Sequence, residues 1–166
     1  MENYRLGVTG SMGCGKSYAC SKLVEIGENQ GVVFTHLDFD DIRRTKPKPY
    51  EVLRERIDHS EGIVLVDWAL LVEDNFINLV NNNVLLVRSD YKTQLGRLVG
   101  RDLPELEIKR RIDAQLTNDQ KERRILEAQT RDRFGKLLSF DTPQNPSDKQ
   151  YQILFYQILE EVRKCN

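Results

Sequence analysis

The segment GSMGCGKS at residues 10–17 carries the strongest chemical pattern in the chain, because it matches G-x-x-x-x-G-K-[ST] in full. Glycines let successive backbone N–H groups turn toward phosphate oxygens, and the start of a following helix adds partial positive charge. Lys16 would neutralise the β- and γ-phosphates, and the Ser17 hydroxyl would be a ligand of Mg²⁺. The pattern predicts binding of ATP with Mg²⁺, and the alternative is a glycine-rich turn between a strand and a helix. The residues expected to contact the nucleotide are Gly10, Ser11, Met12, Gly13, Cys14, Gly15, Lys16, Ser17 and Tyr18.

Carboxylates follow two of the apolar segments. Asp38, Asp40 and Asp41 come after the first segment, and Asp67 comes after the second. Ligands of an open α/β sheet bind beyond the carboxyl ends of its strands, so we expect these carboxylates near the phosphate loop. There a carboxylate can accept the proton of an attacking hydroxyl, or hold Mg²⁺ through water. Asp40 is the candidate general base, and Asp38 and Asp67 are candidate substrate-binding residues. The alternative is that these residues are helix caps or turn formers.

Two groups of basic residues accompany the carboxylates. Residues 43–48 (RRTKPK) carry four positive charges, and Arg43 and Arg44 are candidate acceptor-binding residues. Arg97 and Arg101 stand four residues apart on one predicted helix face, where a closing lid would bring them to the transferred phosphoryl group as catalytic residues. The alternative is that these arginines lie on solvated helix faces. No aromatic residue interleaves the 43–48 group to stack bases, so the pattern does not favour a nucleic-acid acceptor.

Short apolar segments alternate with longer helical patterns along the chain. This alternation predicts a three-layer α/β fold with a five-stranded, parallel sheet and helices on both faces. The whole chain, 1–166, is expected to form one domain, with a helical lid at about 94–133 because the polar surface there exceeds what one buried face needs. Predicted strands are Tyr4–Thr9, Val32–Leu37, Ile63–Val66, Val84–Val87 and Lys136–Phe140. Predicted helices are Lys16–Gly27 with Gly27 as its end, Pro49–Ile57, several within the charged stretch Tyr91–Arg133, and Asp148–Lys164.

Composition narrows the class of protein. Of the 166 residues, 39% are hydrophobic and 31% are charged, with a net charge of −1, which does not favour a uniformly basic nucleic-acid binder. No apolar run is long enough to span a membrane, and the first residues contain no apolar leader. The three cysteines lack zinc-ligand spacing and fit a reducing compartment. We therefore expect a cytoplasmic protein that is a monomer or a small homo-oligomer. Its expected partners, which follow from the phosphate loop, are ATP and a small-molecule acceptor.

Four segments together resemble one family. They are the strand and loop at residues 6–17, DFDDIRR at 38–44, DWALLVE at 67–73, and the series QLGRL, RD and RIDAQ within 94–115. The last three are similar to the patterns D-A-D-x-I-A-R, D-x-P-L-L-[FY]-E and Q-x-x-R-[LV]…R-[DN]…R-I-x-x-Q of dephospho-coenzyme A kinases. These P-loop kinases phosphorylate the ribose 3′-hydroxyl of dephospho-CoA. The resemblance implies a nucleoside-monophosphate-kinase type of fold, Asp40 as the base, and Arg97 and Arg101 as lid arginines.

The chain also departs from that family. Residues 45–62 are much shorter than the helical insert that binds the CoA portion, Ala69 replaces a proline, and the pattern A-D-x-[VI]-[IL]-x-N is missing. The expected function is transfer of the γ-phosphate of ATP to a hydroxyl or phosphate of a small nucleotide-like acceptor, most similar to dephospho-CoA kinase. A nucleoside or nucleoside-monophosphate kinase is the alternative. An alternative from a different functional class is a regulatory NTPase or a non-catalytic nucleotide-binding module. Phe39 and Trp68 would either stack an acceptor base or pack in the core.

Overall fold

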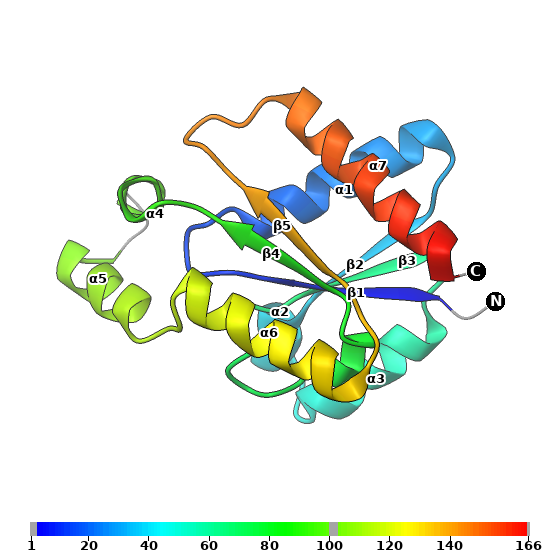
Figure 1. Cartoon of the computed structure of the whole chain (residues 1–166). Helices are drawn as coiled ribbons and strands as arrows, with labels where there is room; N and C mark the ends of the chain where they lie inside the picture. Colours follow the sequence, from blue (N-terminus) through cyan, green and yellow to red (C-terminus); the bar gives the residue numbers. More distant parts are fainter. Residues whose placement is uncertain (1–2, 100–102, 166) are drawn as a thin grey trace.

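Five parallel strands form one sheet in the order β2-β3-β1-β4-β5 (Figure 1) in this computed structural model, which describes residues 3–99 and 103–165. The predicted five-stranded parallel sheet is thereby confirmed. Every residue of β3 is buried, because helices cover both faces of the sheet. The strands are β1 (Tyr4–Thr9), β2 (Phe34–Asp38), β3 (Ile63–Asp67), β4 (Val84–Arg88) and β5 (Leu137–Asp141).

The helices divide between the two faces of the sheet and its carboxyl end. Helices α1 and α7 cover one face, and α2, α3, α6 and the 3₁₀ helix η1 cover the other (Figure 1). Each face has its own hydrophobic core, so the sheet is held rigidly between two apolar layers. The helices are α1 (Lys16–Gln30), α2 (Phe39–Thr45), α3 (Pro49–His59), η1 (Ile77–Val80), α4 (Tyr91–Leu98), α5 (Glu105–Asp113), α6 (Asn118–Asp132) and α7 (Asp148–Cys165).

Gly27 does not end the first helix, so that prediction is wrong. Helix α1 continues to Gln30 and ends at Gly31, whose φ of 69° is the left-handed conformation that favours glycine. Gly27 is instead a packing residue, because a Cβ there would lie 2.6 Å from the carbonyl oxygen of Val32. Val32 thus belongs to the turn after the helix, and β2 begins two residues later than predicted.

The charged stretch from 91 to 133, which contains the expected lid at about 94–133, divides between the core and the carboxyl end of the sheet. Helix α6 packs Ile125 and Ala128 into the core beneath the sheet, so this part of the expected lid is core structure. Helices α4 and α5 lie beyond the carboxyl end of the sheet (Figure 1). Leu98 and Ile108, one on each helix, form a separate small cluster with the side chain of Met12. The candidate lid therefore contacts the phosphate loop directly.

Among the residues that the structure describes, no helix combines the length and the apolar character needed to cross a bilayer.

Candidate active site

The phosphate loop lies between the central strand β1 and helix α1, as the sequence pattern requires. Gly10 and Gly15 both have positive φ, 151° and 94°, and Gly15 caps the start of α1. A Cβ on Gly10 would clash with the carbonyl oxygen of Val87, so only glycine fits against β4 there. The loop thus turns its backbone amides and the start of α1 toward the carboxyl edge of the sheet.

Ser17 and Asp67 meet at the edge of this loop. The Ser17 hydroxyl donates a hydrogen bond to Oδ2 of Asp67 at 2.6 Å, and Nε2 of His36 lies 3.4 Å from the same oxygen. Asp67 is only 4% exposed and His36 braces it from β2, so the carboxylate is well oriented. Oxygen ligands of this kind suit a hard cation, and the Ser17 and Asp67 oxygens therefore fit Mg²⁺.

Cys20 lies beside His36 and Asp67, with one potential ligand atom of each residue within 4.8 Å of the others. Burial raises the pKa of the Cys20 thiol well above its ordinary value, and the nearby Asp67 carboxylate raises it further. Sulfur is a soft ligand and does not suit a hard cation such as Mg²⁺. Cys20 contributes to the packing beneath the loop.

A cavity of about 600 Å³ opens in front of the loop. It brings together groups from five elements, so most of the predicted phosphate and acceptor residues face one space. Its walls include Lys16 and Ser17 from α1, Asp38 at the end of β2, Asp40 and Arg43 from α2, Asp67 from β3, Arg111 from α5, and Gln115. Lys16 points its ammonium group back toward the carbonyl oxygen of Ser11 at 3.4 Å.

The carboxylates at the end of β2 and in the first turn of α2 have different local roles. Asp38 caps α2 by accepting a hydrogen bond from the backbone N–H of Asp41, so the capping alternative holds for this residue. Asp40 lies in the first turn of α2, exposed toward the cavity, and pairs with Arg43 at 3.3 Å. Arg44 pairs instead with Asp41 at 3.0 Å and is not among the residues that line the cavity.

Arg97 lies on the other side of the phosphate loop. Its guanidinium donates to the carbonyl oxygens of Gly13, Cys14 and Pro143 and to the Thr142 hydroxyl, at 2.6–3.3 Å. It therefore lines a second cavity of about 460 Å³ rather than the phosphate cavity. This placement differs from the expectation that Arg97 faces the transferred phosphoryl group.

The second cavity shares three residues with the first, namely Gly13, Gly15 and Tyr18. Its remaining wall is the loop between β5 and α7 together with Tyr151, against which the Tyr18 ring packs edge-on at 5.7 Å. Sequence reasoning did not find this loop, because the expected family pattern is missing there. Arg101, the other predicted lid arginine, lies outside the described residues.

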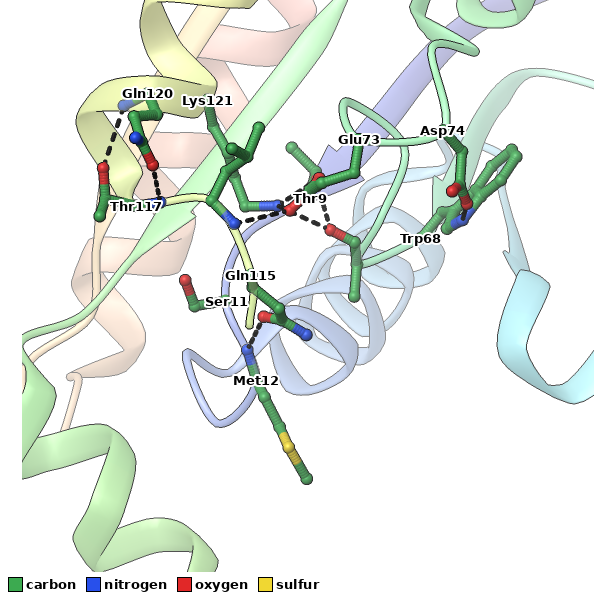
Figure 2. A network of polar contacts seen from close by, with 12 residues as sticks. Thr9, Ser11, Met12, Trp68, Glu73, Asp74, Gln115, Thr117, Gln120 and Lys121 are labelled. Carbon is green, nitrogen blue, oxygen red and sulfur yellow. Dashed lines mark hydrogen bonds and ion pairs between the residues drawn. The ribbon is translucent and has the colours of Figure 1, made fainter. Parts of the chain in front are cut away.

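A polar network behind the loop was also missed from sequence (Figure 2). The ammonium group of Lys121 contacts both Glu73 carboxylate oxygens, at 2.5 and 2.7 Å, and the carbonyl oxygen of Ala69 at 2.9 Å. Glu73 also accepts a hydrogen bond from the backbone N–H of Leu116, at 3.1 Å. Lys121 is fully buried, and burial lowers its pKa while the Glu73 carboxylate opposes that shift.

The aromatic residues after β2 and β3 pack in the core. Phe39 and Trp68 are 0% and 1% exposed, with ring centroids 4.0 Å apart. The core alternative for these two residues is therefore confirmed, and neither offers a free face to an acceptor base.

Comparisons with solved structures show that other proteins share this fold. TT1252 from Thermus thermophilus shares the fold with a TM-score of 0.67 at 18% identity, over 97% of this chain and 98% of that chain. A gluconokinase from Sinorhizobium meliloti 1021 gives a TM-score of 0.59 at 12% identity, over 99% of both chains. A search of curated proteins finds no relative of this chain.

The fold is thus that of the P-loop kinases, and the sequence family narrows it further. The family model for dephospho-CoA kinase matches residues 43–129, just over half of the 166 residues. That range contains Asp67, Glu73, Arg97, Gln115 and Lys121, which the structure gathers around the phosphate loop. The chain belongs to the dephospho-CoA kinase family.

Proposed function

We propose that this kinase transfers the γ-phosphate of ATP to a hydroxyl group of a small, anionic, nucleotide-like acceptor. The observation that carries the proposal is the cavity of about 600 Å³, which holds Lys16, the Ser17–Asp67 pair and Asp40 around one space. These are the groups that phosphoryl transfer needs: a cation for the phosphates, oxygen ligands for Mg²⁺, and a carboxylate for the acceptor proton.

The nucleotide would use both cavities. The adenine would occupy the second cavity, between Arg97, Tyr151 and the β5–α7 loop, and the triphosphate would follow the shared residues Gly13 and Gly15 into the first. Mg²⁺ held by Ser17 and Asp67 would neutralise charge on the β- and γ-phosphates. Lys16 would turn from the Ser11 carbonyl oxygen to the phosphates, a small side-chain movement.

Asp40 would act on the acceptor. Its carboxylate would take the proton of the acceptor hydroxyl as the hydroxyl oxygen attacks the γ-phosphorus and ADP leaves. Arg43 and Arg111 line the same cavity, and their guanidinium groups would bind a phosphate or diphosphate group of the acceptor.

Dephospho-CoA is the first acceptor to test, because the chain belongs to its kinase family. A nucleoside or nucleoside monophosphate is the second candidate. The short α2–α3 segment, 39–59, favours it, since a long acceptor would extend beyond the cavity.

The test is a steady-state assay of ADP formation with ATP and Mg²⁺, run with dephospho-CoA, adenosine, deoxynucleosides and nucleoside monophosphates. We expect acceptor-dependent turnover that Lys16→Ala abolishes, with weaker ATP binding by calorimetry. The matched control is Lys22→Ala, which changes a lysine of the same helix that pairs with Glu25 and Asp148. No acceptor-dependent turnover with any of these compounds, or equal turnover by Lys16→Ala, would contradict the proposal.

A further inference from the structure

We propose that Gln115 is a further catalytic residue, whose side-chain amide N–H groups contact the γ-phosphate during transfer. The inference rests on the proposed function. It assigns a role to Gln115, which the sequence analysis placed in the segment RIDAQ without proposing a function for it.

The phosphate loop fixes the orientation of the Gln115 carboxamide. The backbone N–H of Met12 donates a hydrogen bond to Oε1 of Gln115 at 2.9 Å. Because a backbone N–H is only a donor, the oxygen must face Met12, and the NH₂ group must face the other way. Figure 2 shows the amide nitrogen of Gln115 turned away from Met12. Within residues 3–99 and 103–165, no hydrogen-bond partner is found for that nitrogen.

The position of Gln115 determines which ligand group its donors meet. Gln115 lines the phosphate cavity together with Lys16, Ser17 and Asp40, and it does not line the second cavity. Its NH₂ group would therefore contact the γ-phosphate end of the nucleotide and not the base. Phosphoryl transfer spreads negative charge over three equatorial oxygens, and a preoriented neutral donor stabilises that charge.

Buried contacts hold the backbone next to Gln115. The N–H of Leu116 donates to Glu73, and Glu73 is held by the buried ammonium group of Lys121. Lys121 also donates to the carbonyl oxygen of Ala69, which accepts a second hydrogen bond from the Thr9 hydroxyl just before the loop (Figure 2). The donor is thus anchored to the same strand ends as the loop itself, and needs no rearrangement when the phosphate arrives.

Two readouts test the role of Gln115. In the first, Gln115→Ala should lower kcat about 10²-fold with the best acceptor, the usual loss for one preoriented donor. In the second, calorimetry compares ADP with a non-hydrolysable ATP analogue, and Gln115→Ala should weaken only the analogue. Gln115→Glu keeps an oxygen for Met12 but loses the donors and adds negative charge, so it should be no more active than Gln115→Ala.

Gln120→Ala is the matched control, since the Gln120 carboxamide only closes the capping box of α6 with Thr117. It should leave both readouts unchanged. Wild-type kcat in Gln115→Ala together with an unchanged analogue-to-ADP affinity ratio would overturn the inference. Equal losses of ADP and analogue affinity would also overturn it, because they would show a role in loop structure. A wild-type protein that binds ATP but phosphorylates no acceptor would refute the proposed function alone, since the affinity ratio still tests Gln115.

Discussion

Breaking the buried Glu73–Lys121 pair should destabilise the protein strongly, whereas removing both charges should not. Lys121 is fully buried, and its two shortest contacts are the Glu73 oxygens at 2.5 and 2.7 Å. Glu73→Gln leaves the Lys121 ammonium group buried, with only the carbonyl oxygen of Ala69 and the amide of the introduced glutamine as partners. Loss of one partner of a buried ion pair costs about 3–5 kcal/mol. We expect about 3 kcal/mol here, because Ala69 still accepts one hydrogen bond and Glu73 is 18% exposed.

The double variant Glu73→Gln/Lys121→Met removes both charges. The amide oxygen of the introduced glutamine can still accept the Leu116 N–H, and the methionine fills the space of the lysine stem, so we expect most of the stability to return. The pair should therefore show a coupling energy of about 2 kcal/mol in a double-mutant cycle. The pKa of Lys121 is lowered by burial, so the folded protein releases this proton more readily than the unfolded chain. The stability of Glu73→Gln should consequently rise with pH toward 10.5, the ordinary pKa of lysine.

Urea unfolding of the wild type, both single variants and the double variant measures this coupling. Thermal unfolding should shift by about 6–12 °C in the single variant, at about 2–4 °C for each kcal/mol in a chain of this size. Glu105→Gln is the control, because Glu105 pairs with Lys109 on the exposed surface of α5 and should shift stability by less than about 0.5 kcal/mol. Additive single changes, with coupling below about 0.5 kcal/mol, would refute the reasoning about burial.

Three further predictions concern the loop, its neighbours and pH. Asp40→Asn should lower kcat by about 10²–10⁴-fold with nearly unchanged ATP affinity, measured by steady-state kinetics and calorimetry; full activity would remove Asp40 from the mechanism. Arg97→Ala should raise the KM for ATP and lower urea stability by about 2 kcal/mol, because several hydrogen bonds to backbone carbonyls are lost; unchanged stability would contradict the anchoring. Hydrogen bonds from Arg131 and Asn82 lower the pKa of Asp132 to about 2, so its stabilising contribution is present above about pH 4 and lost as pH falls toward 2. Asp132→Asn should flatten the dependence of urea stability on pH between these two pH values. An unchanged dependence would contradict the stabilising role of the Asp132 carboxylate.

The phosphate loop and the strands could be predicted from the sequence because their determinants are local. The glycines, Lys16 and Ser17 of the loop all fall within residues 10–17. The strand before the loop and the helix after it can be inferred from the neighbouring residues. The apolar runs of β1, β3 and β4 indicate burial on both faces, which only a helix-covered parallel sheet provides. That sheet then brings Asp67 to the edge where the loop begins.

The contacts of Gln115, Lys121 and Arg97 depend on the tertiary structure alone. Met12 and Gln115 are 103 residues apart in the sequence, and their contact depends on where the chain turns between α5 and α6. Lys121 lies in a charged stretch, and the sequence pattern there does not distinguish a solvent-exposed lysine from a buried one. Only the packing of α6 under the sheet buries its ammonium group, and a buried charge must find a carboxylate partner, which the loop after β3 supplies as Glu73.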